Sequence, residues 1–335
     1  MEIIKKTGSK LRRESKYLFR DIGYRSGLYE RFYRSARGSR IVIYHGICKD
    51  DHTRFNPIFL KLKTFEKHLK FYKKHFNVVS LDDYFEQKFS CEKFNICLTF
   101  DDGFENNYKY VLPLLEQYQL PATFFITAIR DAGYNILWND FLGIVSRYGP
   151  DRIVFKNELY QKGLHNKYIS TENGISLVER LRGGGFCEKA EMMKSLYPQV
   201  PFKGIASEDY WLQMTAEQIK TLSASPFASI GAHGYFHNDL ARISINDVEQ
   251  ELIKSKNYLE NITGKPVNSF AFPYGSYTPE VVNAVKASGY KQLLAMDFLF
   301  SQDIADASMR ERFTVNPFIS AGNQMYATIT RSYEH

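Results

Sequence analysis

Three polar clusters of the 335-residue sequence stand where apolar runs end, and together they could hold a metal ion. Asp101 and Asp102 follow NICLTF, His233 and His237 follow ASIGA, and the run 273–275 follows SFAF. Two histidines four residues apart can both offer a ring nitrogen to one ion, and a carboxylate from another strand end would complete a three-ligand set with open positions for water. Such a set suits Zn²⁺, Co²⁺, Ni²⁺ or Fe²⁺, and the ligand types do not choose among them.

The adjacent aspartates are expected to have different tasks. Neighbouring residues of a strand point to opposite faces, so Asp101 and Asp102 do not suit a matched carboxylate pair such as glycosidases use. One would bind the metal, and the other would stay free as a base, kept ionised beside its neighbour by the cation. Asp-Asp-Gly alone is usually a turn or a helix cap. The joint occurrence of three such clusters at strand ends is more specific than any one of them.

The segments that must position these clusters alternate between strand and helix patterns. Apolar, β-branched runs predict strands at 40–47, 95–100, 122–128, 227–233, 268–272, 291–296 and 312–318. Helical spacing or capping signals predict helices at 65–76, 106–118, 214–222, 244–264 and 278–290. This alternation predicts a parallel sheet or barrel, whose carboxyl strand ends would bring the three clusters to one face.

The alternation of strand and helix patterns is interrupted between about residue 130 and residue 212. This stretch contains ILWNDFLGIV, many charges and the run Gly183-Gly184-Gly185. It predicts an inserted, partly helical cap segment with a flexible glycine hinge. Residues 321–335 are expected to form a C-terminal tail. The four cysteines show no metal-site spacing and are expected to be free and mostly buried.

The basic charge of the chain belongs to its first 40 residues, which form a predicted N-terminal arm. This arm has 12 Lys and Arg against 4 Asp and Glu, a balance of +8 within the total of +7. Its mixture of basic and apolar residues suits an anionic membrane surface, and a helix packed on its own domain is the alternative. No nucleic-acid module accompanies the charge. Without an apolar export segment, a cytoplasmic protein is expected, peripheral at the inner membrane face if the arm binds lipid.

The motifs resemble those of one family, the polysaccharide deacetylases, also called the NodB homology domain or carbohydrate esterase family 4. LTFDDGF is similar to the first motif and IGAHGYFH to the second, while FAFPYGSY and the later GYKQLLAMD are similar to the third motif and the segment after it. YHGI resembles the opening strand of one bacterial branch. The resemblance covers roughly residues 41–318, without most of the insertion.

The resemblance implies a deformed (β/α)7 barrel that binds one divalent metal ion, with zinc the first expectation, and removes acetyl groups from N-acetylated sugars. It implies that Asp101 is the general base and that Asp102, His233 and His237 are the metal ligands. It places the backbone N–H of Tyr274 at the oxyanion. The ion would lower the pKa of its water, and the metal and the N–H would together stabilise the oxyanion.

The sequence departs from the family motifs at several positions. Gly234 replaces the usual Ser or Thr of the second motif, which removes a hydroxyl but no ligand. Ala271 stands where many members have an arginine that tethers the base, and Arg312 is our candidate for that task, with an ordinary surface arginine as the alternative. His45 is our candidate for the general acid that protonates the leaving amine, with a structural histidine as the alternative.

The substrate contacts predicted from the resemblance are Trp138, Pro273 and Tyr274. Trp138 could stack on a sugar face or anchor the insertion to the barrel. We therefore expect a metal-dependent deacetylase acting on an N-acetylhexosamine of a surface polysaccharide or its lipid-linked precursor. The alternatives are an O-acetyl esterase or another amide hydrolase on the same site, and a carbohydrate-binding barrel without catalysis.

Overall fold

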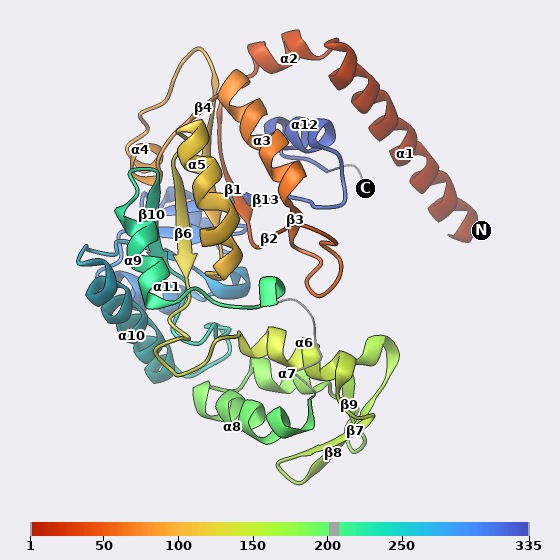
Figure 1. Cartoon of the computed structure of the whole chain (residues 1–335), viewed down its shortest axis with the longest axis vertical. Coiled ribbons are helices and arrows are strands. Elements are labelled where there is room, and N and C mark those ends of the chain that lie inside the picture. Colours follow the sequence, from red (N-terminus) through yellow and green to blue (C-terminus); the bar gives the residue numbers. More distant parts are fainter. Residues whose placement is uncertain (1, 201–207, 334–335) are drawn as a thin grey trace.

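The structure is a computed structural model that describes residues 2–200 and 208–333, with side chains for 12–200 and 209–333. Residues 201–207 of the predicted insertion and residues 334–335 of the predicted tail lie outside the described residues. Figure 1 shows two lobes, a barrel with its surrounding helices and a smaller lobe that faces one end of that barrel. The strand β6 points toward the smaller lobe.

Seven parallel strands form a closed barrel, as expected from the alternating pattern. In barrel order they are β1 (Ser39–Tyr44), β13 (Met309–Thr314), β12 (Gln292–Ala295), β11 (Ser269–Ala271), β10 (Ala228–Ala232), β6 (Ala122–Ile126) and β5 (Phe94–Phe100). The barrel closes because β1 pairs with both β13 and β5. A short strand, β4 (Phe76–Val78), extends the sheet beside the first residues of β5. All seven residues of β5 are buried, which suits a strand covered on both faces.

Helices follow the strands, and two of them carry the predicted capping signals. They include α3 (Leu62–His75), α4 (Leu81–Phe85), α5 (Leu112–Tyr118), α9 (Ala216–Ala224), α10 (Ile245–Thr263) and α11 (Pro279–Ala287). Thr215 and Gln218 form the predicted capping box of α9. Ser244 accepts a hydrogen bond from the N–H of Asp247 at the start of α10, and Gly264 ends that helix in the left-handed conformation. These short-range signals were sufficient to locate both helices.

The predicted helix at 106–118 differs in its first turns. Residues Asn107–Val111 form a π-helical segment, η1, and the α-helix α5 begins only at Leu112. Pro113 lies in the first turn of α5. Because proline has no N–H to donate, it cannot continue a helical ladder from the residues before it, and the hydrogen-bond pattern changes there.

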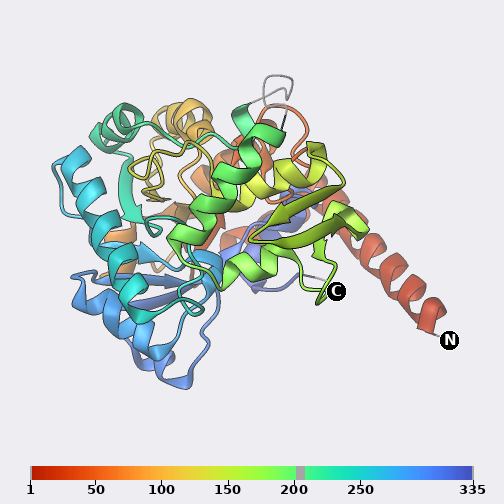
Figure 2. The same cartoon turned by 90° about the horizontal axis from the view of Figure 1, so that it is seen from below.

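The insertion forms a small α+β lobe with its own core, so the prediction of a partly helical segment was incomplete. Its helices are α6 (Trp138–Tyr148), α7 (Leu177–Arg182) and α8 (Phe186–Leu196), and β7 (Arg152–Phe155), β8 (Glu158–Lys162) and β9 (Tyr168–Ser170) form an antiparallel sheet (Figure 2). β7 buries only Ile153 and Phe155, and so short an alternation gives a weak sequence signal. The glycine run 183–185, predicted to be a hinge, joins α7 to α8 inside this lobe.

The N-terminal arm consists of two helices, α1 (Glu2–Ser26) and α2 (Glu30–Ser35), and the barrel begins two residues before the predicted boundary, at Ser39. The predicted C-terminal tail contains a helix, α12 (Ala321–Thr330), which packs against α1. This correction has a clear cause: Met325 is fully buried, and Asn323 Nδ2 donates to the carbonyl oxygen of Tyr17 at 3.1 Å. The free end of α1 projects away from the barrel (Figures 1 and 2).

No helix within the described part of the chain is long and apolar enough to cross a membrane. The cysteines are free, as predicted, but only Cys48 and Cys97 are buried, whereas Cys91 and Cys187 are exposed.

Candidate active site

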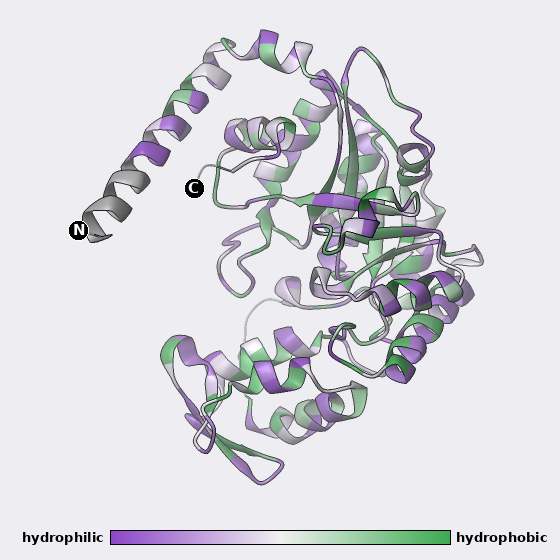
Figure 3. Cartoon of the chain, turned by 180° about the vertical axis from the view of Figure 1, so that it is seen from behind, coloured by the Kyte–Doolittle hydropathy of each residue, from purple (hydrophilic) through white to green (hydrophobic). Residues whose placement is uncertain are grey.

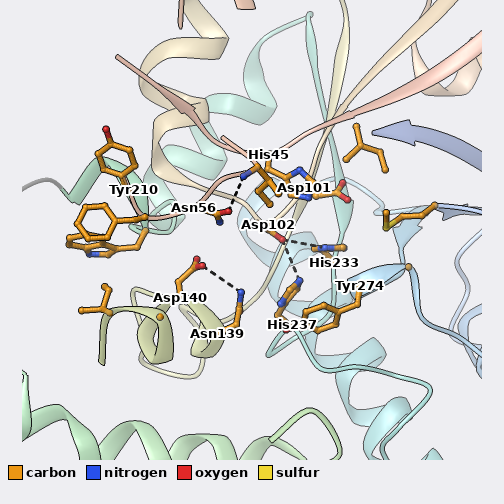
Figure 4. Close-up of a pocket in the computed structure, with 18 of the residues that line it drawn as sticks. His45, Asn56, Asp101, Asp102, Asn139, Asp140, Tyr210, His233, His237 and Tyr274 are labelled. Atoms are coloured by element: carbon orange, nitrogen blue, oxygen red, sulfur yellow. Dashed lines mark hydrogen bonds and ion pairs between the residues drawn. The ribbon is translucent and has the colours of Figure 1, made fainter. Parts of the chain in front are cut away.

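The three polar clusters meet at one end of the barrel. Asp101 and Asp102 follow β5, His233 follows β10, and the segment 272–275 follows β11. A cavity of about 300 Å³ opens between this end of the barrel and the insertion (Figure 4). Its lining includes Asp101, Asp102, His233, His237, Tyr274 and His45. The carboxyl strand ends of a barrel therefore assemble residues that are up to 229 positions apart in the sequence, from 45 to 274.

Asp102, His233 and His237 form a compact three-ligand set. Asp102 Oδ1 lies 3.4 Å from His233 Nε2 and 3.3 Å from His237 Nε2, and all three residues are buried. Two ligand atoms that each lie about 2.1 Å from a tetrahedral ion are about 3.4 Å apart. The spacing of the donors therefore fits one divalent cation of the zinc type, and the identity of the metal is left to experiment.

The tautomer of His233 is fixed by the backbone. Its Nδ1 lies 2.8 Å from the carbonyl oxygen of Ala271. A carbonyl oxygen can only accept, so Nδ1 carries a proton and Nε2, which lies 3.4 Å from Asp102 Oδ1, is the nitrogen available to a cation. Metal-binding histidines are commonly oriented in this way. Burial also lowers the pKa of His237 to about 3, which keeps that ring neutral and able to bind a cation.

Left-handed backbone conformations aim the ligands at the cavity. Asp102 has φ 77° and Gly103 has φ 80°, while His237 has φ 54°. The strand ends at Phe100, so strand alternation no longer applies and both aspartates line the same cavity, contrary to the expectation of opposite faces. Gly103 is needed here, because a Cβ would lie 2.9 Å from Ile126 Cγ2 in addition to the strained φ. The glycine of Asp-Asp-Gly thus has a steric cause.

Gly234 also occupies a position that favours glycine. Its φ is 80°, and a Cβ there would lie 3.0 Å from Glu251 Oε2. The departure from Ser or Thr at this position therefore has a structural cause, since a side chain would be strained and would crowd a buried carboxylate.

The two aspartates have different partners. Asp101 Oδ1 and Oδ2 accept hydrogen bonds from the two terminal nitrogens of Arg312 at 2.7 and 2.8 Å. Both side chains are almost fully buried. Burial raises the pKa of Asp101, but the positive charge of Arg312 and the nearby His233 outweigh it and hold this pKa below its ordinary value. The arrangement leaves Asp101 ionised beside the ligand set.

The predicted contact between Arg312 and Asp101 is therefore present in the structure. Arg312 reaches the aspartate from β13, whereas the family arginine that it would replace stands at the position of Ala271 on β11. Its two parallel hydrogen bonds match the planar guanidinium to the carboxylate, a geometry that lysine cannot reproduce.

His45 lies at the end of β1, beside the aspartates. The N–H of Asp101 donates to the carbonyl oxygen of Tyr44 at 2.9 Å, which ties the ends of β1 and β5 together. Tyr44 points into the core, where its hydroxyl lies 2.7 Å from that of Tyr72, and half-buried His45 lines the cavity. Figure 4 shows the ring of His45 next to Asp101. His45 therefore lines the same cavity as Asp101 and Asp102, where a bound ligand could contact its ring.

Two of the predicted substrate contacts lie outside the cavity lining. Trp138 is only 1% exposed, and its Nε1–H donates to the carbonyl oxygen of His237 at 3.0 Å. It cannot stack on a sugar without rearrangement, so its position agrees with the alternative of an anchor for the insertion. Pro273 is buried below the turn and does not line the cavity. Tyr274 does line it, with its ring 4.6 Å from that of His237.

Sequence reasoning missed the wall of the cavity that lies opposite the ligand set. This wall includes Phe55, Asn139, Asp140, Arg147, Tyr210 and Trp211. Asp140 Oδ2 and the Tyr274 hydroxyl are buried without a hydrogen-bond partner among the described residues. Burial, with a smaller effect of Asp102, holds the pKa of Asp140 well above its usual range. The residues of this wall were missed because they belong to none of the motifs that follow the strands.

A family model matches the part of the chain that carries most of these residues. The profile of the family described as polysaccharide deacetylase matches residues 90–154 and 200–293. The matched region contains Asp101, Asp102, His233, His237 and Tyr274, and the chain belongs to this family. His45 and Arg312 lie outside the matched residues. No curated protein sequence matches the chain significantly.

Solved structures of similar fold include three bacterial proteins. The deacetylase PplD from Streptococcus pyogenes, solved with acetate, is 16% identical, with a TM-score of 0.55 over 87% of this chain and 97% of its own. A polysaccharide deacetylase from Bacillus cereus is 18% identical, with a TM-score of 0.54 over 87% of this chain and 68% of its own. IcaB from Ammonifex degensii is 16% identical, with a TM-score of 0.54 over 88% of this chain and 98% of its own. At this identity the likeness concerns the fold.

Proposed function

We propose that the protein is a metal-dependent deacetylase that hydrolyses the N-acetyl group of an N-acetylhexosamine in a surface polysaccharide or its lipid-linked precursor. The observation that carries this proposal is the pairing of a three-ligand set with an ionised, arginine-bound Asp101 in one cavity. Membership of the polysaccharide deacetylase family supports an acetylated glycan as substrate.

The residues of the chain divide the work of the hydrolysis. Asp102, His233 and His237 would hold a divalent cation, which would act as a Lewis acid and make water more acidic. Asp101 accepts the proton of the attacking water, because Arg312 keeps its carboxylate ionised near neutral pH. The backbone N–H of Tyr274 donates to the oxygen of the acetyl carbonyl as negative charge develops there.

His45 is proposed to donate the proton that the leaving amine requires. Its support is its place in the cavity at the end of the strand that is hydrogen-bonded to Asp101. An amide is a poor substrate for hydrolysis unless its nitrogen is protonated as the bond breaks, so an acid within reach of that nitrogen is needed. The proposal includes the view that the chain is related to the bacterial branch of the family whose first strand ends in Tyr-His, here Tyr44 and His45.

Acetate release from a panel of glycans tests the activity. The protein is loaded with Zn²⁺, Co²⁺ or Ni²⁺ and offered N-acetylated and O-acetylated glycans, with Asp101→Asn as the control. Release from N-acetylated sugars that is lost in Asp101→Asn while metal binding is kept supports the proposal. Release from O-acetylated glycans alone would identify an esterase, and no release from any glycan would favour a binding protein.

The arm is proposed to lie on an anionic membrane at the cytoplasmic face, where it would meet a lipid-linked substrate. Leu18, Phe19 and Ile22 of α1 are 61%, 71% and 52% exposed on the side away from α12, and Arg12 and Arg25 are exposed beside them. Figure 3 shows hydrophilic and hydrophobic residues interleaved along the coloured part of this helix. Apolar side chains flanked by basic ones suit binding to anionic lipid.

Sedimentation with vesicles tests this placement. Wild type is expected to bind vesicles that contain anionic lipid at low salt, and Phe19→Ser is expected to bind less. Phe318→Ser, which alters an exposed aromatic residue elsewhere, serves as the control. Equal binding by Phe19→Ser and wild type, or no binding by wild type, would refute the membrane proposal without affecting the deacetylase.

A further inference from the structure

The insertion holds the loop that carries His237 through one side chain from each of its three helices. This loop, residues 237–239, begins with the metal-ligand histidine itself. The contacts are Trp138 Nε1 to the carbonyl oxygen of His237 at 3.0 Å, Lys189 Nζ to Asn238 Oδ1, and an Arg182 terminal nitrogen to Asp239 Oδ2 at 2.9 Å. Three consecutive loop residues are thus each bound by a different helix: α6, α8 and α7.

Asn238 of this loop and the two residues that precede His237 are held from the barrel side by a buried carboxylate. Glu251 of α10 accepts the N–H groups of Tyr235 and Phe236, both at 2.9 Å. Its other oxygen accepts a hydrogen bond from Asn238 Nδ2 at 2.8 Å. The amide of Asn238 therefore joins the barrel to the insertion, because its nitrogen binds Glu251 and its oxygen binds Lys189.

Lys189 is the central charged group of this contact. It is fully buried, and its ammonium also donates to the carbonyl oxygen of Gly184 at 2.7 Å. Burial lowers its pKa to about 8, against the effect of the nearby carboxylates of Glu251 and Asp239, so the side chain is mostly protonated at pH 7. A buried ammonium is unfavourable unless its hydrogen bonds are satisfied, so its position is closely defined by these acceptors.

The backbone of His237 explains why the loop needs such contacts. Its φ of 54° lies in the left-handed region, which is unfavourable for a residue with a side chain. Such a conformation persists only where surrounding groups determine it more strongly than the local preference. The contacts from the insertion act on His237 itself and on the two residues that follow it.

We propose that the insertion positions the metal ligand His237, and that Lys189 is the positioning residue through which it acts. The inference rests on the metal site of the proposed deacetylase. In this view the insertion does more than cover the cavity, because the geometry of one ligand depends on side chains that lie outside the barrel.

Metal affinity without substrate tests the inference. Zn²⁺ is titrated against a competing chelator for wild type, Lys189→Met and Lys194→Met, the last a matched control from the exposed face of the same helix. Residues that orient metal ligands typically change affinity 10–100-fold when removed. We expect a loss of about that size in Lys189→Met, with none in Lys194→Met.

A second variant keeps the test decisive if Lys189→Met fails to fold. Trp138→Phe keeps an aromatic ring in the core but removes the donor to the carbonyl oxygen of His237, and it is expected to weaken Zn²⁺ binding as well. Wild-type affinity in the folded variants, even with a lower melting temperature, would overturn the inference and leave the deacetylase standing. Wild-type protein that binds Zn²⁺ but releases no acetate would refute the deacetylase and leave the inference standing.

Discussion

Replacement of Arg312 by methionine is expected to destabilise the protein and to shift the pH dependence of catalysis. The guanidinium makes two charge-assisted hydrogen bonds to Asp101, at 2.7 and 2.8 Å, and both side chains are almost fully buried. At about 1.5–3 kcal/mol each, two such bonds come to about 3–6 kcal/mol. Removing one partner of a buried ion pair typically costs about 3–5 kcal/mol. We expect a loss of about 3–5 kcal/mol in the free energy of unfolding at pH 7.

The sign of the pH effect follows from the pKa of Asp101. In the folded wild type this pKa is below its ordinary value, so the ion pair contributes stability above the unfolded pKa of about 3.9 and loses it as pH falls through the folded pKa. Without Arg312, burial raises the pKa of Asp101. The difference in stability between wild type and variant should therefore begin to shrink as the pH falls through the raised pKa of Asp101 in the variant, and it should shrink further as the pH falls below about 4, where the wild type loses its ion pair. The acid limb of kcat/KM should move to higher pH.

Urea denaturation between pH 3 and 8 and the pH profile of kcat/KM measure these effects. Arg310→Met is the control, because Arg310 lies on the same strand and donates only to nearby backbone carbonyls of Ala307 and Met309 in the hydrogen bonds found for it. If Arg312→Met lowers the free energy of unfolding by less than about 1 kcal/mol and keeps the acid limb of the wild-type kcat/KM profile, then Arg312 does not keep the proposed base Asp101 ionised.

Three further outcomes are expected. His45→Ala should lower kcat about 10²–10⁴-fold without loss of bound metal, and near-wild-type turnover would exclude it as the acid. Gly103→Ala should lower the free energy of unfolding by about 1–3 kcal/mol because of its φ of 80° and the contact with Ile126, whereas exposed Gly174→Ala, which adds strain but no contact, should lose less; equal losses would contradict the steric argument. His233→Ala should bind no stoichiometric Zn²⁺ by metal analysis, and retained binding would contradict the ligand assignment.

The chemistry of the site was accessible from the sequence because its motifs are local. LTFDDGF and IGAHGYFH each place their polar residues directly after a buried strand, and parallel strands bring such ends together. Helix caps such as Ser244 and Gly264 were equally readable, since a cap depends on residues within one turn. The role of Arg312 could not be predicted from the sequence pattern alone. Only the family resemblance suggested that another cation should replace the arginine that is missing at Ala271.

The insertion and the termini resisted prediction for the opposite reason. The short strand β7 gives only a weak alternation, and the helix α12 packs against α1, a segment from the other end of the chain, which the sequence does not display. The sequence marks Glu251 only as a polar residue of a long helix, yet its side chain is buried and accepts three hydrogen bonds from the segment 235–238 around His237. Trp138 shows the same limit, because an aromatic residue suits both a sugar contact and a core.

The sequence by itself predicted a parallel sheet or barrel, the candidate ligand types and the pairing of a candidate base with a candidate metal site, because these depend on periodicity and on residues adjacent to strand ends. The tertiary structure decided how the two aspartates share one cavity, since that depends on the left-handed backbone of Asp102 and on Arg312 reaching across from β13. It also decided that side chains of the insertion hold the loop that begins at His237. Such contacts join residues tens to hundreds of positions apart, and only the packed chain brings them within hydrogen-bond distance.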